Sequence, residues 1–575
     1  MQTTVGTPAP GIDLGPILAA LDPEQRAAAI LPDGPAQIIA PAGSGKTTTM
    51  VARLAVLLAR GVQPSRICVV TFNRDAAQDL AGRVAKRLGP SVPDAASIEV
   101  RTLHALARLV LLDAGEGSNI LADRLPLLRA ARRRHAASEP SLPLPEASQL
   151  DTWLSAWKVE GRAPPADAEA VLRTYEELLL ARGAVDFDDL VVRAADLLAT
   201  DPALRMRWQS RFEHVCVDEF QDVDAAQLRL VRLLAAPEDN LFVVGDDDQT
   251  IYAWRLADVR RILRFGKDYP TARRVMLATN YRCPGAVIEA SARMVAVNRE
   301  RFEKPIRAPN GAVHEPASIS AVSSADPRWP QAMAQLAASE DRAGRSLCFL
   351  SRTRGELTPI LLALVAAAVR HTAAIPPIVE ARPVLDLVVA ARGADDGGHP
   401  FHVLRRLRAA RGWDRGSPSG DLLSDEDHAA LDALLGWTAA FRTVDAFVDA
   451  FAGARARIAA LRDPEAHVEL ATVHASKGRE WESVVLIGFE ADRIPNRRTL
   501  VDADDPDRAI EEERRLAYVA VTRATRCLVL AFDPARPSPF LADMGYDAAA
   551  TGSRRRLRAG GASARASALP RAGRR

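Results

Sequence analysis

The chain has 575 residues and a mass of 62.0 kDa, and 48% of its residues are hydrophobic and 26% charged. This is ordinary globular usage, which excludes a long disordered chain and predicts about three or four structural units. The longest apolar run, residues 360–369, is about half of a membrane span. The first 16 residues lack the pattern of a secretory signal, and the five scattered cysteines favour neither disulfides nor a zinc site. We therefore expect a cytoplasmic protein without membrane association.

The net charge of +2 hides an asymmetry between the body and the end of the sequence. Residues 551–575 contain eight arginines and no acid; without those eight, 67 basic residues face 73 acidic ones, a net charge of −6. A basic tail on an acidic body indicates either a polyanion partner or a solvated terminus, and the composition supports both. Only six lysines occur, which makes the position of each more informative.

The first chemical motif lies at residues 37–47, where a short apolar run leads into a glycine-rich turn. The apolar spacing of residues 48–60 then predicts a helix. Strand, glycine-rich loop and helix form the context of a phosphate-binding loop. Gly43 and Gly45 let backbone N–H groups approach the phosphates, Lys46 reaches the β- and γ-phosphates, and Thr47 binds Mg²⁺. Ala40 replaces the first glycine of the general pattern, and the alternative is a tight turn with an incidental lysine.

A second predicted strand, residues 214–217, ends in Asp218 and Glu219. Ligands bind at the carboxyl ends of strands in open α/β sheets, which places both acids at the phosphate site. Asp218 is expected to hold Mg²⁺, directly or through water, and Glu219 to orient and deprotonate the attacking water. The alternative for an Asp-Glu pair alone is a solvated turn.

A third predicted strand, residues 241–245, runs into three consecutive acids at 246–248. Their mutual repulsion predicts a cation nearby. Gln249 is neutral and suits a sensor of the γ-phosphate. Tyr252, Trp254 and Arg255 offer two π-faces and a cation, which favours a stacking platform for single-stranded nucleic acid. For the two aromatic residues, core packing is the alternative.

The ordered set of motifs resembles the UvrD/Rep/PcrA-type superfamily 1 helicases, from about residue 20 to 545. The matching segments are residues 21–26 (the adenine-reading Q motif), 40–47 (the phosphate loop, which in this family begins with Ala), 71–77, 102–104, 185–190, 218–222, 245–255, 280–282, 472–480 and 511–524. Chance occurrence of this whole series is negligible, although several members are weak alone. A kinase or metabolic ATPase would not need the base-stacking aromatics or the last three motifs.

The resemblance implies ATP and Mg²⁺ as cofactors. It makes Gln25 the adenine reader and Tyr281 the ring that stacks on adenine. It sets Glu480 at the ribose or phosphate side, and Arg282 and Arg523 at the γ-phosphate from a second motor domain. The implied nucleotide-contacting set is Gln25, Ala40, Pro41, Ala42, Gly43, Ser44, Gly45, Lys46, Thr47, Thr48, Tyr281, Arg282, Glu480 and Arg523. The implied catalytic set is Lys46, Asp218, Glu219, Gln249, Arg282 and Arg523, and the metal ligands are Thr47 and Asp218.

The resemblance also implies a path for single-stranded DNA, lined by Phe72, His104, Phe187, Tyr252, Trp254, Arg255 and His474. Stacking contributes about 1–3 kcal/mol per base and tolerates any sequence. Lys477 contacts either the DNA backbone or the nucleotide side of the cleft, and the sequence does not decide between them. The chain departs from the family pattern at Leu256, where Gly is frequent, at Arg74 and Asp75, and at Arg479 and Trp481. None of these departures removes a catalytic group.

The implied fold is α/β, with two RecA-like P-loop motor domains whose parallel sheets are flanked by helices. Domain 1A is expected at 1–105 and 186–280, a helical insertion 1B at 106–185, domain 2A at 281–378 and 467–548, a shortened 2B at 379–466, and a basic, disordered tail at 549–575. The 2B segment of about 90 residues is short for the family. A shortened 2B favours good translocation on single strands but poor unwinding alone.

The expected function is that of an ATP-dependent helicase that moves 3′ to 5′ on single-stranded DNA and unwinds tailed duplexes. The direction comes only from the family. DNA repair, recombination and replication all fit, with repair or replication proteins as partners, and the protein is expected to be a monomer or weak oligomer. The alternative is a DNA-stimulated ATPase that acts as a partner-dependent accessory factor or displaces proteins, with little unwinding alone. RNA is a less favoured substrate than DNA, because no feature of the sequence indicates recognition of a 2′-hydroxyl group.

Overall fold

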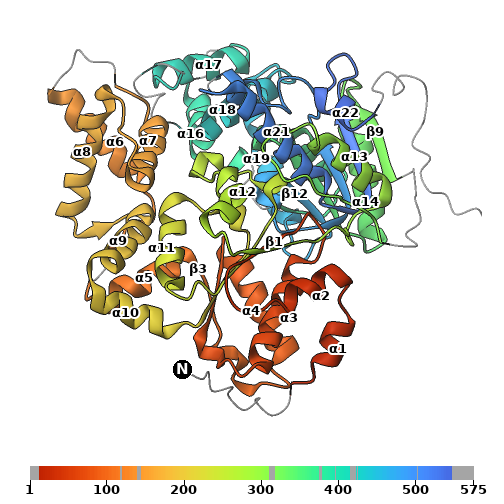
Figure 1. Ribbon diagram of the computed structural model, residues 1–575. Coiled ribbons are helices and arrows are strands. Elements are labelled where there is room, and N and C mark those ends of the chain that lie inside the picture. The colour runs from red at the N-terminus through yellow and green to blue at the C-terminus, as the bar shows by residue number, and fades with distance from the viewer. Residues whose placement is uncertain are drawn as a thin grey trace, which may run out of the picture.

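The structure, a computed structural model, describes residues 12–116, 119–138, 144–309, 318–373, 378–394, 397–414, 417, 423, 425–501 and 503–546. Two six-stranded parallel sheets organise these residues, each flanked by helices. Figure 1 shows the first unit at the bottom and the second at the upper right, with further helical groups at the upper left and top. The expected α/β class with two RecA-like units is confirmed, whereas the predicted domain boundaries stay predictions. The tail predicted at 549–575 lies outside the described residues.

The sheet of the first unit has the strand order β3-β2-β6-β7-β1-β8, and every pairing is parallel. Its strands are β1 (Ala36–Ile39), β2 (Ile67–Thr71), β3 (Glu99–Thr102), β6 (His214–Val217), β7 (Leu241–Gly245) and β8 (Arg273–Met276). The central strands β1, β2, β6 and β7 are buried along their whole length and mostly apolar, because helices cover both faces. Ile38 and Val69 enter one core, whereas Ile39 and Val70 enter the core on the opposite face. The sheet therefore lies buried, with its strand ends open to ligands.

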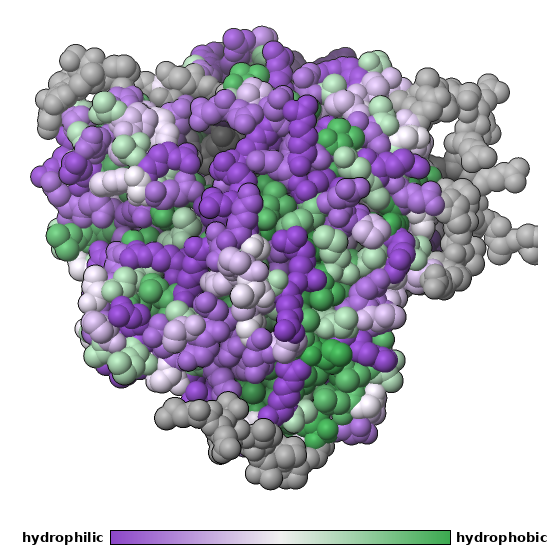
Figure 2. All heavy atoms as spheres, viewed as in Figure 1, coloured by the Kyte–Doolittle hydropathy of each residue, from purple (hydrophilic) through white to green (hydrophobic). Residues whose placement is uncertain are grey.

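The helices of the first unit are α1 (Leu14–Ala19), α2 (Pro23–Ala29), α3 (Lys46–Ala59), α4 (Arg74–Leu88), α5 (Leu103–Asp113), α9 (Phe187–Thr200), α10 (Pro202–Arg211), α11 (Ala225–Ala235) and α12 (Val259–Asp268). Helix α3 begins at Lys46, two residues before the predicted start at 48. In Figure 2 the front of the molecule is largely hydrophilic, and hydrophobic residues gather at the lower right, where Figure 1 places α1 to α3.

A helical group is inserted between α5 and α9, and it has a core of its own. It comprises β4 (Asn119–Ile120), α6 (Leu125–Ser138), α7 (Ala147–Glu160), α8 (Ala166–Ala181) and β5 (Ala184–Val185). Buried ion pairs attach this group to the start of α9. Lys158 Nζ lies 2.9 Å from carboxylate oxygens of both Asp186 and Asp189. Both strands of the small sheet pair in parallel.

The sheet of the second unit has the order β11-β12-β10-β13-β14-β9, again with parallel pairings. Its strands are β9 (Ile319–Ser323), β10 (Leu347–Ser351), β11 (Thr372–Ala373), β12 (Val468–Thr472), β13 (Trp481–Ile487) and β14 (Ala524–Phe532). The helices are α13 (Gly285–Val295), α14 (Trp329–Arg342), α15 (Thr358–Ala366), α20 (Arg497–Val501), α21 (Pro506–Val521) and α22 (Pro539–Asp543).

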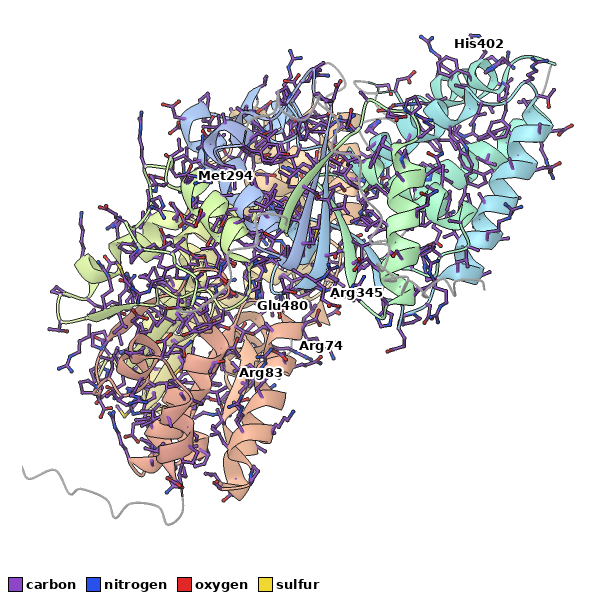
Figure 3. All side chains as sticks on the ribbon, turned by 90° about the vertical axis from the view of Figure 1, so that its right-hand side faces the viewer. Arg74, Arg83, Met294, Arg345, His402 and Glu480 are labelled. Atoms are coloured by element: carbon purple, nitrogen blue, oxygen red, sulfur yellow. The ribbon has the colours of Figure 1, made fainter. Side chains whose placement is uncertain are left out.

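Four helices are inserted into the second unit: α16 (Arg382–Gly393), α17 (Pro400–Ala410), α18 (Asp425–Thr438) and α19 (Val444–Leu461). They share one continuous hydrophobic core with the second sheet, in which Leu404 and Phe447 join Phe349 and Leu470 of the strands. Figure 3 shows the group projecting from this sheet, with His402 at its outer tip. Within the part of the chain that the structure describes, no helix combines the length and apolar character of a membrane span.

Candidate nucleotide and nucleic-acid site

The predicted phosphate loop lies at the carboxyl end of β1, in the interior of the first sheet. Residues 40–45 turn from the strand into α3, whose N-cap is Gly45. The Ala40 N–H donates to the Gly245 carbonyl at 2.8 Å, and the Lys46 ammonium donates to the Ala40 carbonyl at 3.2 Å. The loop, the helix N-terminus and a lysine thus converge, which is the arrangement that binds phosphates.

Two glycines of the loop have no space for a side chain. Gly43 and Gly45 have φ angles of +70° and +81°. A Cβ at Gly43 would collide with the side chains of Asn280 and Arg282, and a Cβ at Gly45 would lie 2.5 Å from the amide nitrogen of Gln25. The loop is therefore in close contact both with Gln25 and with the segment that enters the second unit.

The two residues expected around the adenine, Gln25 and Tyr281, flank this loop. Gln25 is 5% exposed, and its amide nitrogen donates to the Ser44 carbonyl at 2.9 Å. The Tyr281 N–H donates to the Gly43 carbonyl at 2.8 Å, and its hydroxyl donates to Asp22 at 2.8 Å. Tyr281 is 51% exposed.

The two predicted acids follow β6 directly, at the same edge of the sheet as the phosphate loop. Glu219 has a φ of 52°, a left-handed conformation that is uncommon for a non-glycine residue and often marks a functional site. The amide nitrogen of Gln221 donates to the Glu219 carboxylate at 2.5 Å. The backbone is thus strained at the residue that is expected to act on water.

The two carboxyl groups titrate differently. Burial and the charge of Glu219 raise the pKa of Asp218 to about 7. Burial alone would raise the pKa of Glu219 too, but the ammonium groups of Lys46 and Lys477 outweigh it and hold that pKa below its usual value. Glu219 is therefore ionised at neutral pH, as a general base must be.

The three acids that follow β7 are fully buried, and the predicted cation is confirmed. Lys304 lies within ion-pair distance of all three, at 2.9 Å from Asp246 and 2.8 Å from Asp248. Gln249 is next in the chain, and its amide nitrogen donates to Asp246 at 2.6 Å. The candidate γ-phosphate sensor is thus held by an acid that is itself held by Lys304.

Two arginines border the site, Arg282 in the segment that enters the second unit and Arg523 in the second unit itself. Arg282 Nε donates to Glu480 at 2.6 Å, and Figure 3 shows Glu480 between the two sheet units. Arg523 follows α21 and is buried, and its Nε donates to the Val519 carbonyl at 2.8 Å. Burial and the charge of Arg282 lower the pKa of Arg523 to about 10, so it remains a cation at neutral pH.

Comparison with known families agrees with this geometry. The model of the UvrD/REP helicase N-terminal domain matches residues 21–270, and that of the UvrD-like helicase C-terminal domain matches residues 455–533. The chain is 30% identical over 563 residues to the ATP-dependent DNA helicase UvrD2 of Mycobacterium tuberculosis H37Rv, with 90% of this chain and 79% of that protein covered. The chain belongs to the UvrD-like helicase family.

Other relatives cover different shares of the chain. The ATP-dependent DNA helicase PcrA of Leuconostoc citreum is 30% identical over 607 residues, with 87% of this chain and 80% of that protein covered. DNA helicase II of Escherichia coli K12 is 33% identical over 324 residues, with 54% of this chain and 44% of that protein covered.

In this UvrD-like chain several residues of the expected DNA path lie around Tyr252. Phe72 stacks on Tyr252 with ring centroids 4.7 Å apart and planes 21° apart, and Trp254 and His474 each lie 6.3 Å from Tyr252. Trp254 is 59% exposed, with the Arg255 guanidinium 4.6 Å from its ring centroid. The expectation of core packing fits the partly buried Tyr252 better than it fits Trp254.

The remaining two residues of the expected path form a second aromatic contact. His104 and Phe187 meet edge to face at 5.8 Å, and Phe187 is 46% exposed. Burial lowers the pKa of His104, and burial with the neighbouring Arg352 lowers that of His474 to about 3. Both imidazoles are therefore neutral at neutral pH and offer ring faces instead of positive charge.

Lys477 contacts both groups of residues between which the sequence did not decide. Its ammonium pairs with Asp222 and donates to the Gln249 carbonyl at 2.7 Å, and it lies 5.3 Å from the Tyr252 ring centroid. Lys477 thus joins the second unit to the segment that carries Gln249 and Tyr252.

The departures from the UvrD-like pattern have local structural counterparts. Leu256 has a φ of 63°, so it adopts the conformation that a glycine at this position takes without strain. Arg479 pairs with Glu469 of β12 and lies 4.9 Å from the Trp481 ring centroid, while the Trp481 indole N–H donates to Glu469 at 3.3 Å. Arg74 and Asp75 begin α4 at exposed positions.

The sequence motifs did not predict the roles of three residues at the site. Gln221 joins Glu219 to the backbone of Asp246, Arg352 borders a groove of 860 Å³ that also contains Trp254 and His474, and Lys304 pairs with the three buried acids. Gln221 lies inside the 218–222 motif, and the three acids predicted a cation without indicating which one.

Proposed function

We propose that the protein is an ATP-dependent DNA helicase that moves 3′ to 5′ along single-stranded DNA and serves DNA repair, recombination or replication. One observation carries the proposal: the phosphate loop and acids of the first unit lie close to arginines of the second, beside a group of aromatic rings of which Trp254 and Phe187 are exposed. An ATPase site shared between two units couples hydrolysis to their relative motion. The direction rests on the family alone.

The phosphate loop fits ATP with Mg²⁺. Gly43 and Gly45 bring Asn280, Arg282 and Gln25 close to the loop, and the buried Ser44 Oγ and Asn280 Nδ2 have no hydrogen-bond partner among the described residues. We assign Thr47 and Asp218 as ligands of Mg²⁺, which would neutralise charge on the β- and γ-phosphates. Polar groups and backbone N–H groups are thus available for a bound triphosphate.

The side chains around the loop have separate roles in ATP hydrolysis. Lys46 contacts the β- and γ-phosphates, and Glu219 accepts a proton from the attacking water. Gln249 hydrogen-bonds the γ-phosphate, and Arg282 and Arg523 stabilise the charge that develops on it. Because both arginines belong to the second unit, their engagement draws the units together and product release separates them.

The DNA track is proposed to run along the 860 Å³ groove between Trp254, Arg352 and His474. Exposed rings and neutral imidazoles provide stacking faces for bases of any sequence. The Arg255 guanidinium adds a cation beside the Trp254 ring. We therefore expect little sequence preference and a strong dependence on salt.

Replacement of Trp254 tests the track. Trp254→Ala is expected to weaken binding of a single-stranded oligonucleotide by about 1–3 kcal/mol, or about 5- to 150-fold, because one stacking face is lost. Fluorescence anisotropy measures the affinity. Trp413→Ala is the matched control, since Trp413 is also covered by an arginine, at 5.4 Å, but does not line the groove. Equal affinities of Trp254→Ala and wild type would show that bases do not stack there.

A second candidate function is that of a translocase with little unwinding alone. The observation that favours it is the shared core of α16–α19 and the second sheet, which makes the inserted helices a fixed extension of that unit. A short, fixed insertion has little freedom to rearrange around a duplex. Partner proteins would then supply or direct strand separation.

Tailed duplexes and streptavidin-blocked single strands separate the two candidates. A helicase that acts alone unwinds a 3′-tailed duplex under single-turnover conditions and leaves a 5′-tailed duplex paired. The translocase displaces streptavidin from a 5′-biotinylated single strand but does not open the 3′-tailed duplex. Unwinding of the 5′-tailed duplex instead would contradict the proposed direction.

A further inference from the structure

A segment outside the catalytic motifs joins the two units at the nucleotide site. Residues 298–307, here called the linking segment, follow α13 of the second unit and precede β9 in the chain. Midway along it, the fully buried Lys304 ammonium contacts the acids that follow β7 in the first unit. The Phe302 N–H also donates to Asp247 at 2.7 Å, and Arg301 donates to both carboxylate oxygens of Asp248 at 3.0 and 2.9 Å.

The beginning of the linking segment is fixed to α21, the helix that ends just before Arg523. The Glu511 carboxylate accepts hydrogen bonds from the N–H groups of Arg299 and Glu300, at 2.7 and 3.2 Å. Arg515 donates to the Glu300 carbonyl at 2.7 Å. The same short segment therefore contacts the helix of the second unit that leads to Arg523 and the acidic turn of the first unit.

From Lys304 an unbroken series of hydrogen bonds leads to the reacting groups. Asp246 accepts from Lys304 with one carboxylate oxygen and from Gln249 with the other, at 2.9 and 2.6 Å. The Asp246 N–H donates to Gln221 at 2.9 Å, and Gln221 donates to Glu219 at 2.5 Å. The candidate sensor and the candidate base are thus both attached to the residue that Lys304 holds.

The free-energy cost of burying these charged side chains indicates that they do more than stabilise the fold. Burial of charges costs several kcal/mol per ion, and apolar replacements of buried ion pairs are often neutral or stabilising. Three adjacent buried carboxylates that share Lys304 and Arg301 still hold more negative than positive charge, and are therefore a poor choice for stability alone. Such ion pairs do fix the orientation of side chains, because hydrogen-bond donors hold each of these carboxylates in one orientation.

We propose that Lys304 is a positioning residue for ATP hydrolysis, which acts through Asp246 to hold Gln249 and Glu219 in their reactive orientation. Through the linking segment it makes this orientation depend on the placement of α21, and hence of Arg523. The inference rests on the proposed function and adds to it a residue that touches neither ATP nor DNA.

The test compares Lys304→Met with a double variant that also carries Asp247→Asn. Lys304→Met is expected to lower the melting temperature. It should also lower kcat of DNA-stimulated ATP hydrolysis about 10²-fold, the loss that a misplacement of about 1 Å produces. The ATP KM should stay near its wild-type value because the phosphate loop is untouched. The double variant removes one buried negative charge together with the lysine, so it should recover the melting temperature but not kcat.

Lys158→Met is the matched control, since Lys158 is also a buried lysine among carboxylates, and its ion-pair partners Glu176, Asp186 and Asp189 lie outside the nucleotide site. Lys158→Met should have a lower melting temperature than the wild-type protein and the same kcat at saturating DNA. Recovery of both melting temperature and kcat in the double variant would overturn the inference, because Lys304 would then only compensate charge. Unchanged kcat in a folded Lys304→Met protein would overturn it as well. A wild-type protein that does not hydrolyse ATP would overturn the proposed function, and this inference with it.

Discussion

Glu219→Gln is expected to abolish ATP hydrolysis and leave ATP binding intact. Lys46 and Lys477 hold the pKa of Glu219 low enough for it to be ionised at neutral pH, and a glutamine cannot accept the proton of the attacking water. Loss of a general base reduces kcat by about 10²–10⁴-fold. Glu219 is also one cause of the raised pKa of Asp218, so its neutralisation leaves Asp218 more readily ionised for Mg²⁺.

Steady-state hydrolysis and equilibrium binding of a fluorescent ATP analogue together measure this effect. Glu213→Gln is the matched control: Glu213 precedes the same strand at its opposite end, where it pairs with Arg66 at 3.3 Å. That variant should hydrolyse ATP at the wild-type rate. Near wild-type hydrolysis by Glu219→Gln would mean that another group activates the water.

Arg523→Ala is expected to lower kcat by about 10³–10⁵-fold, the range that an arginine acting on a transferring phosphoryl group contributes. Arg523 remains a cation in its buried site, and the charge of Glu219 acts on it across the boundary between the units. Arg523→Lys should recover only part of the rate, because lysine keeps the charge but lacks the planar fork of donors.

The rate should be measured at saturating ATP and DNA, with the folded state checked by circular dichroism. Arg536→Ala is the control, since Arg536 lies in the same unit but pairs with Asp492 on the surface at 2.6 Å. It should leave kcat unchanged. If Arg523→Ala and Arg523→Lys are both folded and both fully active, Arg523 does not act on the γ-phosphate.

Local sequence was sufficient to predict the parts of the site that are contiguous in the chain. The strand, loop and helix around Lys46, and the acids after β6, are specified by apolar runs and glycines within about ten residues, and each occurs where it was expected. Parallel strands then bring these ends to one edge of the sheet. Their expected proximity therefore follows from topology without any knowledge of side-chain packing.

Long-range contacts could not be predicted in the same way. The three acids after β7 predicted a cation, but nothing in the sequence selects Lys304, which is more than fifty residues further along. The contacts of Lys477 depend on how the second unit meets the first. The length of the 379–466 segment predicted a small insertion, whereas its shared core with the second sheet depends on how four helices pack.

ATP hydrolysis by the purified protein, with and without single-stranded DNA, tests the central claim most directly. The shared site and the aromatic track predict slow hydrolysis alone and strong stimulation by DNA, because bound DNA aligns the two units that supply Glu219 and Arg523. Hydrolysis at the same rate with and without DNA would contradict the account, since the nucleotide site would then work independently of the proposed track.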